Sequence, residues 1–318
     1  MDFSTVRNNR SGPVLVIGAA GLDVIAHLDG GFKPGSSNPA KIRTSYGGVA
    51  RNVAENLARL GQEVILLTVT GEDQNGSLIL AHTEKAGVNI SQSIHTNNYP
   101  TGFYMGVISK KGQGELAVDD MRVMTCLTQE ELEKRAHLFK KASLVFLDAN
   151  LSEDTLQTAI GLARKNKVPV CADPASSSLA PRLLLHLPDF YLITPNSTEA
   201  GILTGSEFDS SDRKAAMRVA RHLVNLGVEI ALITLAEFGV CYATSETSGQ
   251  VPAIKTRVVD PTGAGDALTA AVMFALLNEM DIDEAVRLGV SAASLALRYP
   301  GTVVPDLSLE KLYDQLLV

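Results

Sequence analysis

The sequence predicts an α/β protein, a three-layer α/β/α sandwich with a mostly parallel central sheet and a small β-sheet lid. Short apolar runs such as 13–18, 144–147 and 230–234 are typical of strands that are buried on both faces. Helical stretches separate these runs, and repeated strand–helix units build parallel sheets with helices on both faces. Because no linker or clear internal repeat divides the chain, we expect residues 1–318 to form one domain.

The first expected strand is 13–18, and Asp23 is expected just past its carboxyl end, where open α/β sheets bind ligands. Gly47 and Gly48 then open a helix. Two glycines allow a ligand to approach the backbone closely, and Asn52 on the first turn can donate and accept hydrogen bonds. A plain turn with solvated side chains is the alternative for each of these residues.

Two segments depart from the strand–helix alternation. Residues 29–46 are rich in Gly, Pro, Ser and Asn, and 101–109 with 115–118 has the pattern of a hairpin that turns at Lys110–Gly112. We expect lid segments at about 29–46 and 97–125 that cover a ligand, with an edge hairpin of the core as the alternative. Since an uncovered sheet edge invites pairing, a homodimer through the lid sheet is expected.

Polar residues follow several of the expected strands. The strands are expected at 64–70, 144–147, 168–172, 190–193 and 230–234, and from residue 127 onward the helices are expected at 128–140, 152–165, 179–187, 210–226, 281–298 and 308–316. Asp148, Asp173 and Asn196 lie just past three of these strands. Because the carboxyl ends of parallel strands meet at one edge, we expect these side chains to share a cleft with Asp23.

The composition argues against several classes of function. A net charge of −7 does not provide the basic surface that nucleic acid requires, and no stretch approaches the ~20 apolar residues of a membrane span. Cys126, Cys171 and Cys241 fit neither a zinc pattern nor a disulfide framework. The first ten residues contain no apolar run of signal-peptide type, so the cytoplasm is the expected location.

The stretch 258–268 carries the most specific chemical signal. Asp260 and Pro261 form a turn, and Thr262-Gly-Ala-Gly-Asp266 leads into an apolar helix. The N–H groups of a helix N-terminus among small residues bind anions, and a carboxylate on its first turn, here Asp266, can serve as a base. An ordinary capped helix is the alternative.

Asn196 and Glu199 begin another helix after a strand. Side chains three residues apart lie on one helical face, so this pair can steer a hydrated divalent metal. A capping box with Asn196 as the cap is the alternative, and these four residues alone favour it slightly. The stretch from Thr234 to Gly239 ends a strand and turns, which suits contact with a nucleotide.

Together these motifs resemble the signatures of the ribokinase-like (PfkB) carbohydrate kinases. Tyr46–Gly61 resembles the N-terminal signature, Asp260–Asp266 resembles the C-terminal signature, and Thr194–Glu199 contains the Asn-x-x-Glu motif. Their order and spacing agree, and the resemblance covers nearly the whole chain. The pseudouridine-kinase branch of the family is further resembled by Ser37–Ile42, Gly114–Met121 and Asp148–Glu153.

Two positions depart from the family pattern. Gly21 stands where members commonly carry Asn, so one sugar contact is expected to be missing or supplied by another residue. Ala236 stands where the turn after Thr234 often holds Gly, which alters the expected backbone path near the nucleotide. Neither change affects the resemblance of the Gly-rich motif.

The resemblance implies an ATP-dependent kinase that phosphorylates a primary hydroxyl of a sugar or nucleoside, with the 5′-hydroxyl of pseudouridine as the first candidate. In that reaction Asp266 is the base, and the backbone N–H groups of Gly263, Ala264 and Gly265 hold the charge on the phosphoryl oxygens. The other implied roles are substrate binding by Asp23, Gly47, Gly48, Asn52 and Asp148; nucleotide binding by Asn196, Thr234, Gly239, Thr262, Gly263 and Gly265; orientation of Mg²⁺ through water by Asn196 and Glu199; and a monovalent-cation (K⁺) site at Asp260.

Three alternative functions follow from the same residues. A kinase of ribose, a keto sugar or another nucleoside would carry the same motifs. A non-catalytic sugar-binding protein of the same fold is expected to lose the anion-binding turn or the base, whereas Gly263, Gly265 and Asp266 are all present. A dinucleotide-dependent oxidoreductase would need G-x-G-x-x-G after the first strand, and Gly18-Ala-Ala-Gly21 lacks that spacing.

Overall fold

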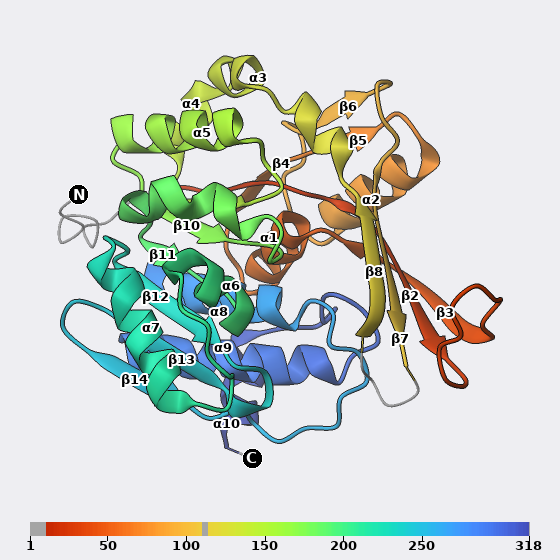
Figure 1. Cartoon of the computed structure of the whole chain (residues 1–318). Helices are drawn as coiled ribbons and strands as arrows, with labels where there is room; N and C mark the ends of the chain where they lie inside the picture. The colour runs from red at the N-terminus through yellow and green to blue at the C-terminus, as the bar shows by residue number, and fades with distance from the viewer. Residues whose placement is uncertain (1–10, 110–113, 318) are drawn as a thin grey trace.

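The computed structural model describes residues 11–109 and 114–317, and it confirms the predicted three-layer α/β/α fold (Figure 1). The strands of the central sheet are β1 (Val14–Ile17), β4 (Val64–Leu67), β9 (Leu144–Asp148), β10 (Val170–Asp173), β11 (Leu192–Ile193), β12 (Ile230–Thr234), β13 (Val240–Ala243) and β14 (Ser248–Val251). Their order across the sheet is β14-β13-β12-β11-β10-β9-β1-β4. The strands from β4 to β12 run parallel, and β13 and β14 are antiparallel at one edge.

Helices cover both faces of this sheet. One face packs against α1 (Val49–Arg59), α8 (Ala264–Leu277), α9 (Ile282–Leu297) and α10 (Leu309–Leu316), and the other against α3 (Gln129–Lys134), α4 (Ala136–Lys141), α5 (Glu153–Lys165), η3 (Ala180–Asp189), α6 (Ser197–Thr204) and α7 (Arg213–Asn225). Along β1, Val14 and Val16 belong to one core while Leu15 and Ile17 belong to the other. Burial on both sides explains why this strand is a continuous apolar run. In the part of the chain that the structure describes, no helix is long and apolar enough to cross a bilayer.

A separate four-stranded sheet stands off the main body, at the right of Figure 1. Its strands are β2 (Gly21–Leu28), β3 (Ala40–Gly47), β7 (Gly102–Ile108) and β8 (Gly114–Asp120), in the order β3-β2-β7-β8. The expected hairpin is β7 and β8, and its expected turn at Lys110–Gly112 lies outside the described residues. We call these four strands the lid sheet.

The lid sheet corrects the expectation for Asp23. This residue does not lie in a turn after the first strand but inside β2, because residues 18–20 alone carry the chain from β1 into the lid sheet. The lid sheet therefore includes 21–28, which the two expected lid segments left out. In register across the strands, Asp23 stands between Ser45 and Tyr104.

Other elements differ from the expectation in ways that local contacts explain. The strand expected at 64–70 is divided into β4 and β5 (Val69–Gly71), because β5 leaves the central sheet to pair with β6 (Ile94–Thr96). The helix expected at 128–140 is interrupted at Arg135, whose backbone has a φ of −107°. The segment 179–187 lies in a 3₁₀ helix, η3, where Pro181 and Pro188 cannot donate backbone hydrogen bonds. Helix α2 (Gln74–Lys85) lies beside the lid sheet.

The carboxyl ends of the parallel strands bring polar residues to one edge of the central sheet, as the alternation of strands and helices predicts. Asp148 ends β9 and pairs directly with Asp173, which ends β10. Thr194 follows β11, and Asn196 forms an isolated bridge with Thr234 at the end of β12. The candidate site is therefore built on this edge.

Ala236, which stands where the family pattern often holds Gly, has a strained backbone conformation. It begins the short 3₁₀ turn η4 (Ala236–Phe238) with a φ of +49°, in the left-handed region that costs a residue with a Cβ about 1–2 kcal/mol. Because this cost exceeds the ~0.4–1 kcal/mol by which glycine favours the unfolded chain, Ala236→Gly should raise the free energy of unfolding by about 0.5 kcal/mol. Urea denaturation with an unchanged m-value measures this.

The control is Ala81→Gly on the exposed face of α2, where the same chemical change should lower the free energy of unfolding by about 1 kcal/mol. Equal destabilisation by both substitutions would show that the left-handed backbone at Ala236 carries no strain.

Candidate active site

Two sequence motifs from opposite ends of the chain meet at a single hydrogen bond. Asn52 lies near the start of α1, and Asp266 lies on the first turn of α8, which packs against α1. The Asn52 side-chain Nδ2 donates to Asp266 Oδ2 at 2.6 Å. The predicted base and a predicted substrate ligand are therefore neighbours in space.

The two glycines before Asp266 have different physical roles. Gly263 has a φ of +80°, and a Cβ there would lie 2.1 Å from the carbonyl oxygen of Thr302, so the turn itself demands glycine. Gly265 is exposed, and beyond its chain neighbours and the backbone of its own helix no atom of the described residues lies within 4 Å of where its Cβ would be. Open space above Gly265 leaves room for a ligand against the backbone.

The N-terminus of α8 is suited to an anion. Within the described residues no side chain caps this end of the helix, and its N-cap is Gly263. Uncapped N–H groups and the helix dipole together favour negative charge at this point. The donor set and the open space above Gly265 therefore fit a phosphate group.

Glycines also shape the turn on the other side of Asn52. A Cβ on Gly47 would lie 2.1 Å from the carboxylate oxygens of Asp23, and Gly48 has a φ of +93° with Ala19 O only 2.4 Å from where its Cβ would be. These two positions let the turn approach both Asp23 and the loop after β1. Asp23 is buried as a result.

Burial perturbs the pKa values of the Asp266 and Asp23 carboxyl groups. It raises the pKa of Asp266 to about 7, with Asp148 adding to the rise and the Asn52 hydrogen bond and the Arg51 charge opposing it. Burial likewise raises the pKa of Asp23 to about 7, opposed by Arg51 and reinforced by Asp266 and Asp260. A carboxylate with a pKa near the working pH is poised to accept a proton from an alcohol.

Asp148 is fully buried and serves the backbone. Its Oδ2 accepts from the N–H groups of Ala19 (2.8 Å) and Ala50 (3.1 Å), and its Oδ1 accepts from the N–H of Asn150 (3.0 Å). The carboxylate thus caps the start of α1 and fixes the loop after β1. Substrate binding by Asp148 stays a prediction, and these contacts show what else the residue does.

Asn196 and Glu199 form the capping box that the sequence analysis gave as the alternative to a metal site. The Asn196 N–H donates to Glu199 Oε2 at 2.9 Å, and the Glu199 N–H donates to Asn196 Oδ1 at 3.0 Å. The cap does not by itself exclude a second role, because a carboxylate has further lone pairs.

Carboxylates from three elements act on one another beside this cap. The pKa of Asp173 lies well above its ordinary value because of burial and the charges of Glu199 and Asp266. Asp173 Oδ2 accepts from the Thr194 hydroxyl at 3.0 Å, which in turn accepts from Thr269 of α8 at 3.0 Å. Mutual repulsion among buried oxygens fits a hydrated Mg²⁺, which prefers oxygen ligands and retains water. The described residues contain no group of three or more metal-ligating side chains close enough to bind a metal directly.

The remaining predicted nucleotide and cation residues have structural contacts of their own. Asp260 is buried, and its Oδ1 accepts from the Thr262 N–H at 2.9 Å. Thr234 ends β12, and Gly239, with a φ of +91°, shapes the turn into β13, where a Cβ would meet Val251 O at 2.1 Å. Their roles toward a nucleotide or a K⁺ ion stay predictions.

Sequence reasoning missed Arg51 and left Asp173 without a role. Arg51, Glu55 and Arg59 follow the four-residue spacing of a solvent-exposed charged stripe, yet Arg51 and Glu55 are each only 1% exposed. The available signal was the position of Arg51 directly before Asn52 in the N-terminal signature. Its burial depends on tertiary packing, which the spacing does not reveal.

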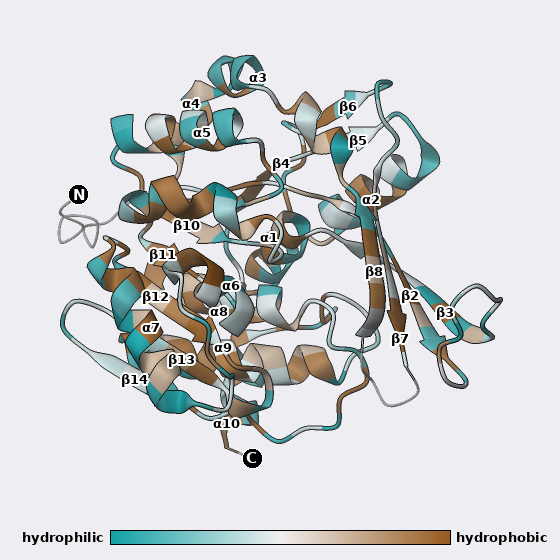
Figure 2. Ribbon diagram, in the orientation of Figure 1, coloured by the Kyte–Doolittle hydropathy of each residue, from teal (hydrophilic) through white to brown (hydrophobic). Residues whose placement is uncertain are grey.

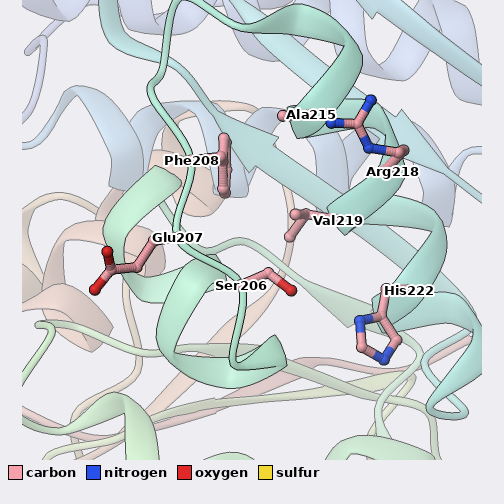
Figure 3. Close-up of a pocket in the computed structure, with 7 residues that line it drawn as sticks. All are labelled: Ser206, Glu207, Phe208, Ala215, Arg218, Val219 and His222. Carbon is pink, nitrogen blue, oxygen red and sulfur yellow. The ribbon is translucent and has the colours of Figure 1, made fainter.

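Two cavities lie outside this cluster of residues. The first, of about 170 Å³, lies between the loop after α6 and helix α7, where Arg218 and His222 project from the helix (Figure 3). It lies past the end of α6 opposite to Asn196 and contains no predicted site residue. The second, of about 470 Å³, lies between the end of β8 and the loops after β9 and β10; its lining includes Asp119, Met121, Arg122, Asn150, Ser178 and Arg182. We call it the lid-base cavity.

Comparison with known proteins places the chain in a family. The pfkB family carbohydrate kinase model matches residues 13–308, so the chain belongs to this family. It is a kinase, a phosphotransferase that acts on a sugar or a nucleoside. Among its relatives, pseudouridine kinase of Escherichia coli (strain K12) is 32% identical over 297 residues, which are 93% of this chain and 94% of that protein.

Further relatives act on other substrates according to their names. Guanosine-inosine kinase of Exiguobacterium acetylicum is 29% identical and aligns over 88% of this chain and 93% of its own length. The structure of Arabidopsis thaliana ribokinase complexed with ribose and ATP has a TM-score of 0.82 at 24% identity, covering 97% of this chain and 99% of that one. This last likeness supports the ribokinase-like fold.

The raised pKa of Asp266 predicts how kcat/KM depends on pH. A base is active only when deprotonated, so activity should fall on the acid side of pH ~7 and reach a plateau above it. An aspartate at its ordinary pKa would instead give a flat profile between pH 5 and 8. Initial rates across pH 5–9 measure this.

Asn52→Ala provides the matched comparison, because it removes a hydrogen bond that lowers the pKa of Asp266. The acid limb of its profile should move to higher pH, whatever happens to its height. A wild-type profile without an acid limb above pH 5.5 contradicts the raised pKa.

Proposed function

We propose that this kinase transfers the γ-phosphoryl group of ATP to the 5′-hydroxyl of pseudouridine. The observation that carries the proposal is the placement of Asp266: a carboxyl with its pKa raised to about 7, held by Asn52, on the first turn of an uncapped helix. This arrangement offers a base and an anion site within one helical turn. Both are what attack of an alcohol on a phosphoryl group requires.

The proposed step follows from these positions. Asp266 takes the proton of the attacking 5′-hydroxyl while the oxygen of that hydroxyl bonds to the γ-phosphorus. The bond from the γ-phosphorus to the β–γ bridging oxygen breaks in the same step and releases ADP. The N–H groups of Gly263, Ala264 and Gly265 hold the charge on the phosphoryl oxygens. Asp23 and Asn52 hold the ribose hydroxyls with the backbone of Gly47 and Gly48, which fixes the 5′-hydroxyl before Asp266.

The nucleotide and metal assignments rest on charge and on donor type. ATP is supported by the uncapped anion site, and the ribokinase structure described above was determined with ATP. Glu199 and Asn196 are proposed to orient Mg²⁺ through water, and a bound cation would favour the ionised form of Asp173, whose pKa is raised by burial and by the charges of Glu199 and Asp266. A bound Mg²⁺ would neutralise phosphate charge. Asp260 is proposed to contribute to a K⁺ site, and activity that is unchanged when K⁺ is replaced by a bulky organic cation contradicts that part.

The lid-base cavity favours a nucleoside over a free sugar. Its lining includes Asp119, which pairs across the lid sheet with Tyr104, and Tyr104 pairs with Asp23. Asp119 therefore lies on the same face of the lid sheet as Asp23, two strands away, and the cavity volume of about 470 Å³ has room for a planar nucleobase. The 32% identical pseudouridine kinase supports the same choice. A kinase of a free sugar is the alternative, which the ribokinase likeness keeps open.

Gly21 has a packing reason in this chain. A Cβ there would lie 2.7 Å from Gly102 O and 3.0 Å from Met121 Cε, so Met121 fills the space beside it. Met121 also lines the lid-base cavity. The sugar contact that family members make from this position is therefore proposed to come from another residue.

The outer face of the lid sheet supports the proposed homodimer. Ile42, Met105, Leu116 and Val118 expose between 38% and 67% of their surface, and β7 and β8 are coloured as hydrophobic in Figure 2. An exposed apolar sheet face is a common association surface. Sedimentation that finds only monomers at micromolar concentration contradicts the dimer.

The cytoplasm is the proposed location, in keeping with three free cysteines.

Turnover on pseudouridine, uridine and ribose tests the substrate assignment. The kcat/KM for pseudouridine should exceed that for either other acceptor by at least about tenfold, the discrimination that one or two polar contacts to the base provide. Phosphorylated product is measured by mass spectrometry, with ADP release as a second readout. A preference for ribose contradicts the nucleoside assignment but leaves the proposed phosphoryl transfer intact.

A pair of variants at neighbouring residues tests where the nucleobase of the substrate binds. Ser178→Phe fills the lid-base cavity and should raise the KM for pseudouridine at least about tenfold while leaving the KM for ribose within threefold. Ser177→Phe, one residue away on the surface and not in the cavity lining, should change neither value. Equal effects of both substitutions on the KM for pseudouridine would show that the nucleobase does not bind in the lid-base cavity.

A further inference from the structure

Arg51 is a buried cation that the proposed chemistry does not use. Only 1% of its side chain is exposed, and burying a guanidinium costs several kcal/mol unless ion pairs and hydrogen bonds compensate it. One compensating partner is Glu55, whose Oε2 lies 2.5 Å from Arg51 Nη1. The other partners of Arg51 are uncharged hydrogen-bond acceptors in and around the candidate active site.

Arg51 donates to the turn on the sugar side of the site. Its Nε donates to Gly47 O at 3.1 Å, and its Nη2 donates to Tyr46 O at 2.7 Å. These carbonyls belong to the turn in which Gly47 approaches Asp23. The guanidinium therefore fixes the path of the turn that the sugar is proposed to contact.

Arg51 also contacts the loop that supports the anion-binding turn. Its Nη2 donates to Thr302 Oγ1 at 3.0 Å, and the Thr302 hydroxyl donates to Tyr46 O at 2.5 Å. The carbonyl oxygen of Thr302 occupies the space where a Cβ on Gly263 would lie. One buried side chain thus joins the sugar-side turn to the support of the phosphate-side turn.

The contact with Asn52 determines which way the amide faces. Arg51 Nη2 shares its two hydrogens among Tyr46 O, Thr302 Oγ1 and Asn52 Oδ1. Because the amide oxygen of Asn52 accepts from Arg51, its Nδ2 is the group that faces Asp266. An amide turned by 180° would present its oxygen to the carboxylate and repel it. The guanidinium therefore selects the orientation of Asn52 that holds Asp266.

We propose that Arg51 is a positioning residue for phosphoryl transfer: it orients Asn52 against Asp266 and ties the sugar-side turn to the support of the anion-binding turn. The proposal rests on the proposed role of Asp266 as the base. Arg51 acts on the reacting group Asp266 only through Asn52 and the backbone of the two turns, because Arg51 itself is buried beneath the site.

Charge provides a readout of this arrangement. Of the charged groups that shift the pKa of Asp23 and Asp266 in the described residues, Arg51 alone is positive. The titratable and charged groups that surround Arg51 and Asp266 on the packed elements are Glu55 and Arg59 of α1, His82 of α2, Asp23 of β2, Asp148 of β9, Asp173 of β10 and Asp260 before α8. Removing Arg51 takes away the positive charge that lowers the pKa of Asp23 and of Asp266.

The test compares four variants with the wild type on the full chain. Arg51→Met removes the charge and the contacts, and Arg51→Met with Glu55→Gln also removes the buried carboxylate that loses this ion pair, should the single variant fold poorly. Arg51→Lys retains the charge without the planar fork. Arg59→Met is the matched control, since Arg59 pairs with the same Glu55 from the same helix. Thermal unfolding identifies the variants that fold.

Both charge-removing variants should lower kcat about 100-fold, the cost of misplacing a reacting group, with a smaller change in KM. The acid limb of their pH profile should move up by about one pH unit, since an opposite charge nearby lowers a carboxyl pKa by about that much. Arg51→Lys should restore the position of the limb but not the full kcat, and Arg59→Met should change neither.

The proposal is overturned if a folded charge-removing variant keeps both kcat and the acid limb of the wild type, or if Arg59→Met reproduces its effects. A titration of the Asp266 carboxyl by ¹³C NMR, assigned with Asp266→Asn, needs no activity. If the wild type phosphorylates no acceptor, the proposed function fails. An unchanged Asp266 pKa in Arg51→Met would then overturn the positioning role separately, and an upward shift would support it.

Discussion

The hydrogen bond from Asn52 to Asp266 joins residues 214 positions apart, and the geometry of the candidate site depends on it. It requires α1 and α8 to start at the same point above the sheet edge. Asp148 achieves this for α1 by binding the Ala50 N–H, and Thr302 shapes the turn before α8 by lying against Gly263. Asn52 and Asp266 are thus each held in place by backbone contacts that a substitution at Asp148 or at Gly263 would break.

The site brings together acidic side chains for which the protein supplies little compensating positive charge. Asp23, Asp173, Glu199 and Asp266 all have pKa values above their ordinary range, chiefly because of burial. Such carboxyls disfavour ionisation until a cation arrives, so binding of a metal and protonation are coupled in this site. The uncapped start of α8 lies beside them and favours an anion. A nucleotide with its metal would satisfy both preferences together.

Local patterns in the sequence predict the layered fold and most of the strands, because burial on both faces makes parallel strands continuous apolar runs. They also predict that Asn52 and Asp266 belong to ligand-binding turns. Patterns do not reveal that Asp23 lies inside the lid sheet, since residues 18–20 give no turn signal of their own. Nor do they reveal the burial of Arg51, because four-residue charge spacing is typical of exposed helix faces. Both failures concern tertiary contacts over long sequence separations.

The role of Asp266 as the base is the claim on which the account depends most. The most direct measurement is single-turnover phosphorylation by Asp266→Asn, which keeps the shape of the side chain and an acceptor for Asn52. Loss of a positioned base should slow the chemical step by about 10²–10⁴-fold, while the Kd for ATP changes less than about threefold. A variant that transfers phosphate at near the wild-type rate would contradict the account.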